Sequence, residues 1–365
     1  MGLTLVITGC SGGGTTGGAS VSTPPTNTPP VLPAIATWLR VFPKSFVYKT
    51  VVNPKTMLTD IAYNIDYYFR NELIMKAAHA AARKLYKVSA KGDKGLVMGM
   101  YGEILTSNNK FKDWAPEVSG EIETFYDGVI TTNASLVLGG NLEPIMRRSE
   151  NGGPWLKPTF NGPSITYFTA VSVDPTNPNK MVVGGASGKA YSSDNGKTFT
   201  CYGGVNHQAI LYWGEGCIFA IDANNHEVLA YRDDDMSVVK YTISLPGIST
   251  GITRVNDDLI VSGFQAPNTG KVWRIRFTNV QTGNYELPVD ITPTEQGIGY
   301  WALSSAGAND ISVACSADKI YHSTDSGSTW VLETTQTTGL TSITGLVTTS
   351  DGTNLGVEQD SILKK

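Results

Sequence analysis

Short apolar runs separated by turn residues repeat along the chain from about residue 86 to its end. The clearest unit has apolar runs at 170–173, 181–185 and 189–191, with the turn Asp174–Asn179 after the first. Runs of this length between Gly, Pro, Asn and Asp clusters are typical of β-strands. Their recurrence with a period of about 40 residues is typical of propeller blades. Residues 86–365 are therefore predicted to form an all-β propeller.

The repeat also predicts the number of blades. Units start near residues 86, 121, 162, 206, 246, 296 and 340, which favours seven blades, with six as the alternative. The last unit, from Thr341 to Lys365, is short by about one strand. Propellers close their ring by pairing an N-terminal strand with the final blade, because this removes exposed strand edges. Residues 44–50 (KSFVYKT) are the predicted closing strand.

Residues 1–34 have the pattern of an anchor followed by a tether. Ile7–Cys10 (ITGC) resembles a bacterial lipobox in which Cys10 would carry lipid, although no Lys or Arg precedes it. The alternative is an apolar strand that pairs with a neighbouring chain. Residues 11–33 are rich in Gly, Ser and Thr and then in Pro, a composition typical of linkers.

Residues 35–85 are predicted to form extended segments and then one long amphipathic helix. Thr56 is the predicted N-cap, and apolar residues follow it at three- and four-residue steps. This apolar stripe consists of Leu58, Ile61, Ile65, Phe69 and Leu73. An amphipathic helix must bury its stripe, so this one is expected to pack against the propeller or against another subunit.

Charge is unevenly distributed. Residues 1–85 carry a net charge of +5 and the remainder −9, against −4 for the whole chain. An acidic propeller has the wrong sign for nucleic acid, which binds basic surfaces. No run approaches the ~20 apolar residues of a membrane helix, so no membrane span is predicted.

The cysteines do not suggest a cofactor. Cys10, Cys201, Cys217 and Cys315 lack the spacing of metal ligands, so no metal or other cofactor is predicted. Buried single thiols are expected for the last three, with a Cys201–Cys217 disulfide as the alternative.

Two loops match the Asp-box pattern S-x-D-x-G-x-T-[FW]. They are Ser192–Phe199 (SSDNGKTF) and Ser323–Trp330 (STDSGSTW), and a degenerate copy occupies residues 148–155. In such a loop the Asp accepts hydrogen bonds from turn amides, the Gly adopts a positive φ and the aromatic residue packs between sheets. The residues assigned to this structural role are Ser192, Asp194, Gly196, Thr198, Phe199, Ser323, Asp325, Gly327, Thr329 and Trp330.

These loops, with the DPTNPN turn at 174–179, resemble those of the BNR/Asp-box superfamily of sialidase-like propellers. That superfamily includes sialidases, xyloglucan-hydrolysing propellers, sortilin-type receptors and photosystem-assembly lipoproteins. The resemblance covers roughly residues 86–365 and implies the fold, with the Asp-boxes on the outer rim as structural marks. It does not imply a function.

The residues argue against an enzyme. A sialidase of this superfamily uses an arginine triad and an Arg-Ile-Pro motif, and the sequence contains no Arg-Ile-Pro. Arg274 and Arg276 alternate along a strand and are expected to face solvent. The propeller arginines are Arg147, Arg148, Arg232, Arg254, Arg274 and Arg276. No pair of carboxylates stands out as the acid and base that glycoside hydrolysis requires.

Other polar clusters are interpreted in the same way. Asp233–Asp235 is expected to be a solvated turn, with a bound cation as the alternative. The histidines His207, His226 and His322 fall on different blades without a nucleophile beside them. No catalytic residue is therefore predicted.

Two aromatic pairs are the candidate binding residues. Tyr212–Trp213 and Tyr300–Trp301 fall on inner strands of the fourth and sixth blades. Neighbouring residues of a strand point to opposite sides, so one of each pair is expected in a blade core. The other is expected either near the channel or loop rim, where aromatic rings stack on sugars, or in the core as well.

The resulting hypothesis is a non-enzymatic bacteriophage virion protein on the tail or capsid surface. Residues 1–85 would dock it to other virion proteins within an oligomeric assembly, and the propeller would bind a host-surface glycan or protein. The first alternative is a lipid-anchored propeller on a bacterial outer membrane or cell surface, attached through Cys10. The second alternative is a glycoside hydrolase.

Overall fold

The computed structural model describes the propeller and one strand that precedes it. The described residues are 39–42, 85–117, 119, 124–139, 145–149, 152–266, 269–293, 300–307, 309–315, 319–333, 343–349, 351–358 and 361–365. The chain divides into two units, Met1–Ile35 and Ala36–Lys365, and every described residue belongs to the second.

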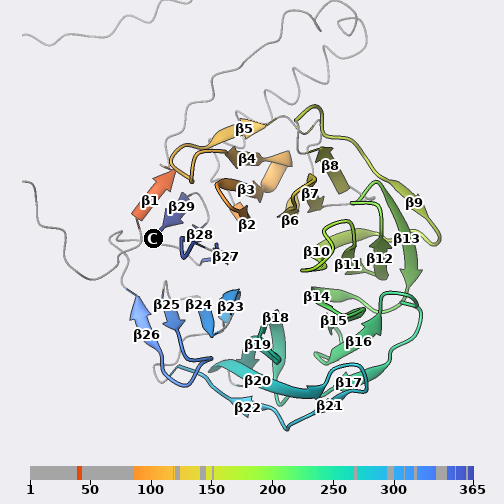
Figure 1. Cartoon of the computed structure of the whole chain (residues 1–365), viewed down its shortest axis with the longest axis vertical. Coiled ribbons are helices and arrows are strands. Elements are labelled where there is room, and N and C mark those ends of the chain that lie inside the picture. Colours follow the sequence, from red (N-terminus) through yellow and green to blue (C-terminus); the bar gives the residue numbers. More distant parts are fainter. Residues whose placement is uncertain are drawn as a thin grey trace, which may run out of the picture. The chain divides into compact units, whose positions relative to one another are not determined.

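Seven sheets, antiparallel except for one parallel pairing in blade 3, stand around a common axis as the blades of a β-propeller (Figure 1). Blade 1 contains β2 (Leu85–Lys91), β3 (Lys94–Gly99), β4 (Ile104–Ser107) and β5 (Ala115–Glu117), with the short 3-10 helix η1 (Met100–Gly102) after β3. Blade 2 contains β6 (Phe125–Ile130), β7 (Ala134–Gly139) and β8 (Ile145–Ser149). Blade 3 contains β10 (Tyr167–Val173), β11 (Met181–Ala186), β12 (Gly188–Ser192), β13 (Thr198–Gly203) and, parallel to β13, β9 (Thr159–Asn161).

The remaining blades follow in chain order. Blade 4 contains β14 (His207–Gly214), β15 (Cys217–Asp222), β16 (Val228–Arg232) and β17 (Tyr241–Ile243). Blade 5 contains β18 (Ile248–Val255), β19 (Asp258–Gln265), β20 (Thr269–Asn279), β21 (Asn284–Tyr285) and β22 (Val289–Asp290). Blade 6 contains β23 (Tyr300–Gly307), β24 (Asp310–Cys315), β25 (Ile320–Ser323) and β26 (Val331–Glu333). Blade 7 contains β27 (Gly345–Thr348), β28 (Asn354–Glu358), β29 (Ser361–Lys364) and β1 (Leu39–Phe42).

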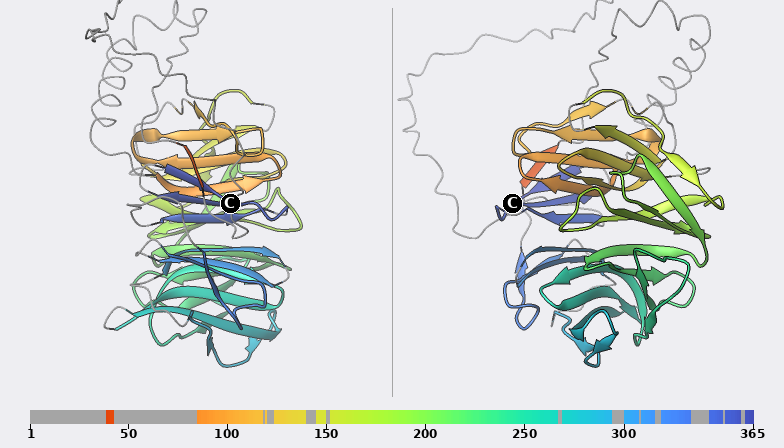
Figure 2. Two further views of the ribbon diagram at one scale, coloured as in Figure 1. Left: turned by 90° about the vertical axis from the view of Figure 1, so that its left-hand side faces the viewer. Right: turned by 45° about the vertical axis from the view of Figure 1, so that its right-hand side comes forward.

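The structure confirms seven blades, and the alternative of six is wrong. An N-terminal strand does complete the last blade, since β1 pairs antiparallel with β29, with Arg40 opposite Leu363. The segment predicted for this role, residues 44–50, lies outside the described residues. In the side views the orange strands of blade 1 lie beside the dark blue strands of blade 7, where the ring closes (Figure 2).

Two other predictions cannot be followed in the structure. The helix expected from Thr56 and the segment around Cys10 lie outside the described residues. The predicted end of that helix, Leu85, is described and begins the strand β2.

Among the described residues no helix is long and apolar enough to cross a membrane. Cys201, Cys217 and Cys315 are buried free thiols, so a Cys201–Cys217 disulfide is wrong.

The core lies between the blades, because the sheet of each blade is covered on both faces by the sheets of its neighbours. All six residues of β11 and of β15 are buried. One cluster between blades 3 and 4 joins Val182 to Ile218 and Leu229, and another joins Phe219 of blade 4 to Trp273 of blade 5. Burial of this apolar surface is the main force that holds successive blades together.

The inner strands are also linked by hydrogen bonds from backbone amides to side chains of the preceding blade. Ser89 Oγ accepts from the Ile130 amide at 3.2 Å, and Ser172 Oγ from the Tyr212 amide at 2.8 Å. Asp127 Oδ2 does the same for Val171 at 3.1 Å, and Ser304 Oγ for Thr348 at 2.9 Å. These bonds satisfy amides at strand edges that no neighbouring strand pairs.

Candidate functional site

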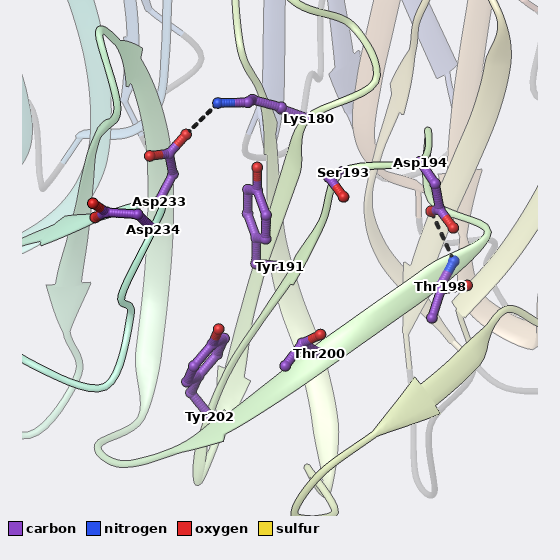
Figure 3. Close-up of a pocket in the computed structure, with 9 residues that line it drawn as sticks. All are labelled: Lys180, Tyr191, Ser193, Asp194, Thr198, Thr200, Tyr202, Asp233 and Asp234. Atoms are coloured by element: carbon purple, nitrogen blue, oxygen red, sulfur yellow. Dashed lines mark hydrogen bonds and ion pairs between the residues drawn. The ribbon is translucent and has the colours of Figure 1, made fainter.

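A polar cavity of about 640 Å³ lies between blades 3 and 4, and is called here the blade 3–4 groove (Figure 3). Its volume is within the ~300–1,000 Å³ range of small-molecule sites. Three loops on one side of the ring form its rim: the β10–β11 turn, the β12–β13 loop and the β16–β17 loop. The lining residues are Lys180, Tyr191, Ser193, Asp194, Thr198, Thr200, Tyr202, Asp233 and Asp234.

An ion pair crosses the groove from blade 3 to blade 4. Lys180 Nζ donates to Asp233 Oδ2 at 2.6 Å, and the Tyr212 hydroxyl donates to the same oxygen at 2.5 Å. Burial raises the pKa of Asp233, but the hydrogen bonds from Lys180 and Tyr212 outweigh it and the pKa is lowered overall. The bond to Asp233 raises the pKa of Lys180. Both groups are therefore charged at neutral pH and compensate each other.

Tyr212 connects Asp233 to Tyr191 in this hydrogen-bond network. Burial and its bond to Asp233 raise the pKa of Tyr212 far above the usual range, so the phenol remains a donor. Tyr191 shares a hydrogen bond with Tyr212, and its pKa is also raised, chiefly by burial. A chain of Lys180, Asp233, Tyr212 and Tyr191 thus fixes the walls of the groove.

One end of the groove is formed by the first Asp-box loop. Asp194 Oδ1 accepts from the amides of Lys197 at 3.0 Å and Thr198 at 2.9 Å, and from the Ser192 hydroxyl at 2.8 Å. Burial opposes ionisation of Asp194, but these bonds outweigh it and lower the pKa. Gly196 has φ +72°, and Phe199 is fully buried between the sheets. The main role of Asp194 is therefore to hold the turn together, and it also lines the groove.

The second Asp-box loop, in blade 6, has the same geometry. Asp325 Oδ1 accepts from the Thr329 amide at 2.8 Å and Oδ2 from the Thr329 hydroxyl at 2.6 Å, which lowers the pKa of Asp325 to about 2. Gly327 has φ +84°, and Trp330 Nε1 donates to the Ile291 carbonyl at 2.7 Å. The surroundings differ, because His322 and Val331 of blade 6 stand where Tyr191 and Thr200 stand in blade 3.

The outer strands of blade 3 present a polar, aromatic face to blade 4. Lys189 is opposite Tyr202, and Tyr191 is opposite Thr200, in the β12–β13 pairing. Residues opposite each other in a pair, or two apart in a strand, point to the same side of the sheet. Lys189, Tyr191, Thr200 and Tyr202 therefore share one side, and Figure 3 shows the three of them that line the groove.

A buried basic cluster lies behind this face. Lys189 is 2% exposed, and its Nζ lies 4.2 Å from the centre of the Tyr231 ring. His207 is 2% exposed, and its ring meets Tyr231 edge-on at 5.8 Å. Burial lowers the pKa of Lys189 to about 8, while burial and the nearby Lys189 lower the pKa of His207 to about 4.

The predicted aromatic platform is not present at Tyr212 and Trp213. Each is 2% exposed, so neither ring has a face left for a sugar. Tyr212 packs in the cluster between blades 3 and 4, whereas Trp213 packs against Phe219 and Phe277 and under the Arg254 guanidinium at 4.2 Å. Tyr300 and Trp301 begin β23, whereas Tyr212 and Trp213 lie near the end of β14, so the two pairs occupy opposite ends of inner strands.

The structure also places the other predicted polar residues. Asp233 is part of the groove network, whereas Asp234 and Asp235 are exposed, and Asp234 pairs with Arg232 at 3.0 Å. Within the described residues no group of His, Cys, Asp and Glu has the geometry of a metal site. Arg276 is exposed, as predicted, and pairs with the buried Asp258 at 3.0 Å, whereas Arg274 is half-buried and lies 3.9 Å from the same carboxylate.

The remaining arginines and histidines are dispersed over the ring. Arg147 donates to the Asn195 carbonyl, Arg148 pairs with Glu117 at 2.7 Å, and Arg254 donates to the Trp213 carbonyl. His226 lies in a turn at φ +61°, and His322 bonds to Ser312. These residues are spread over blades 2, 4, 5 and 6 and do not converge on one centre.

Sequence reasoning did not identify Lys180, Lys189, Thr200 or Tyr202. The available signal was weak: Thr200 and Tyr202 alternate along the strand that follows the Asp-box, so they share a face. Lys180 and Asp233 are 53 positions apart, and only the packing of two blades brings them together.

Comparisons with known proteins place the chain in a fold class. No protein-family model matches it, and no curated protein matches its sequence. Among solved structures it is similar to YCF48 from Cyanidioschyzon merolae, with a TM-score of 0.62, 12% identity, and 78% of this chain and 95% of that chain covered. A streptogramin B lyase structure gives a TM-score of 0.62, 15% identity, and coverage of 78% and 93%.

A third structure, of YCF48 bound to D1 peptide, gives a TM-score of 0.60 and 14% identity, with 78% of this chain and 91% of that chain covered. At these identities the likeness shows the fold alone, because one fold hosts many unrelated functions. The chain is a seven-bladed β-propeller.

Proposed function

We propose that this chain is a non-enzymatic structural and binding component of a bacteriophage virion, on the tail or capsid surface. Its N-terminal arm, residues 1–85, docks it to other virion proteins, and its propeller binds a protein or glycan. The propeller assembles with other subunits of the particle.

The observation that carries this proposal is the way the arm joins the propeller. β1 is the outermost strand of blade 7, hydrogen-bonded to β29. The backbone hydrogen bonds of this pairing attach the arm firmly to the sheet of blade 7, which suits a docking element. The tether composition of residues 11–33 supports the same interpretation.

The state of the groove supports binding in preference to catalysis. Its carboxylates are already paired with Lys180, Arg232 and turn amides, which favours a rigid, pre-organised surface. The peptide complex of YCF48 offers an analogy at the level of the fold.

The proposal is tested on particles from the native source. Deletion of residues 1–35 spares β1, so the propeller should fold while incorporation into particles is lost, as measured by quantitative mass spectrometry of purified virions. Unchanged incorporation would contradict docking by residues 1–35 of the arm. Release of the protein from a membrane fraction by Cys10→Ser would instead favour the lipid-anchored propeller.

A further inference from the structure

We infer that the blade 3–4 groove is a binding site for neutral saccharides. The inference rests on the proposed binding function and names the ligand class of one site. It is carried by the chemistry of the groove lining, which offers hydroxyl groups and aromatic rings in a cavity whose carboxylates already accept hydrogen bonds or ion pairs from neighbouring groups.

The existing partners of the three groove carboxylates argue against an ionic ligand. Asp233 is paired with Lys180, Asp234 with Arg232, and Asp194 accepts from two amides of its own turn. A cationic ligand would compete with Lys180 and Arg232 for the carboxylates they pair with, and an anionic one would face three carboxylates. A neutral polyol meets neither cost.

The remaining lining groups complement a polyol. Ser193 and Thr200 are exposed, and each adds a hydroxyl that both donates and accepts hydrogen bonds. The carboxylate of Asp234 is a strong acceptor for sugar hydroxyls and is 65% exposed. These groups come from the Asp-box loop, from β13 and from the β16–β17 loop, so they surround the cavity from several sides.

Two phenol rings supply the apolar contact that sugars require. Tyr191 and Tyr202 are half-buried and line the groove on the blade 3 side (Figure 3). The C–H face of a pyranose ring packs against aromatic rings, which are amphipathic and have few rotatable bonds. Tyr202 lies next to Thr200 on the same face of β13, so a ring and a hydroxyl are available side by side.

Blade 6 provides an internal comparison. It has the same Asp-box turn, but His322, Val331 and Glu333 occupy the positions of Tyr191, Thr200 and Tyr202. Glu333 is 7% exposed and paired with Lys365. The saccharide site therefore depends on residues outside the Asp-box pattern and is not a general property of the loop.

The test is titration of the full-length chain with neutral oligosaccharides of the gluco, galacto and N-acetylglucosamine series, followed by calorimetry and saturation-transfer NMR. Sialyllactose and oligolysine serve as anionic and cationic comparisons. We expect at least one neutral series to bind, Tyr202→Ala to weaken it about tenfold or more, and Ser193→Ala to weaken it by a smaller factor. The matched blade 6 variant, Thr324→Ala, should leave the affinity unchanged.

Several outcomes would overturn the inference. They are the failure of all neutral saccharides to bind, a preference for oligolysine or sialyllactose, and binding that Tyr202→Ala leaves intact. Thermal unfolding of each variant separates loss of the site from loss of the fold. If saccharides fail while deletion of residues 1–35 still abolishes incorporation into particles, only the saccharide site is wrong.

Discussion

The ammonium group of Lys189 lies 4.2 Å from the centre of the Tyr231 ring, in the interface between blades 3 and 4. The lysine is 2% exposed, so its charge loses most of its hydration on folding, and the ring face returns only part of it. Burial therefore lowers the pKa of Lys189 to about 8, from 10.5. The interface accordingly contains a charge that destabilises it at neutral pH.

Lys189→Met should remove this penalty. Between the folded pKa of about 8 and the unfolded value of 10.5, the unfolded state binds more protons, so stability rises with pH. From pH 7.5 to 9.5 the wild type should gain about 2 kcal/mol in unfolding free energy relative to the variant. Urea denaturation of both proteins at the two pH values measures this. Parallel pH dependence in the two proteins would show that Lys189 does not titrate differently on folding.

His207 should have an effect of the same sign in a more acidic pH window. Its folded pKa is about 4 and its ordinary value 6.5, so the unfolded chain takes up a proton first as the pH falls. From pH 7.5 to 5.0 the wild type should lose about 2 kcal/mol of stability relative to His207→Leu. Both ring nitrogens of His207 lack hydrogen-bond partners in the part of the chain that the structure describes, so leucine leaves no new unpaired group there. NMR titration of the His207 ring provides an independent check, and a midpoint near 6.5 would contradict the prediction.

The blades could be predicted from the sequence because the signals for them are local. Turn residues and Asp-box loops each depend on a few neighbouring residues, and the 40-residue period is the recurrence of these local patterns along the chain. The predicted starts near 206 and 246 fall within two residues of His207 and Ile248, where β14 and β18 begin. The closing strand was harder to predict from the sequence, because both residues 44–50 and Leu39–Phe42 have a composition that suits a strand. Only the long-range pairing with β29 identifies Leu39–Phe42 as the strand that closes the ring.

The groove could not be predicted, for a geometrical reason. In a propeller both faces of a sheet pack against neighbouring blades, and the channel meets only the edge of the inner strand. Alternation along β14 therefore sends Tyr212 toward blade 3 and Trp213 toward blade 5, and neither to a ligand. Lys180 and Asp233 belong to separate repeats, so no period or motif links them.

The Asp-box carboxylates should matter for the stability of their loops. Asp194→Ala removes the acceptor for two turn amides and a hydroxyl, which should lower the unfolding free energy by about 1–3 kcal/mol. Asp325→Ala should also destabilise, and the double variant should be additive, because the loops lie in separate blades. Asp93→Ala, which breaks only an exposed pair with Lys110 at 4.0 Å, is the control and should change little. Chemical denaturation of the four variants measures each effect. Equal stability of Asp194→Ala and Asp93→Ala would contradict a structural role for the Asp194 carboxylate.

Two truncations should separate the arm from the ring. Removal of residues 1–35 leaves β1 in place, so the thermal midpoint should stay within a few degrees of that of the full-length chain. Removal of residues 1–42 strips the outer strand from blade 7 and exposes the backbone of β29, including the groups that face Arg40 in the intact sheet. An open edge of this kind loses ladder hydrogen bonds and pairs readily with other chains. The longer truncation should therefore melt at a lower temperature and elute as aggregates in size-exclusion chromatography. If both truncations behave as the full-length chain does, the ring does not depend on β1 for closure, and the docking role argued from that strand loses its structural basis.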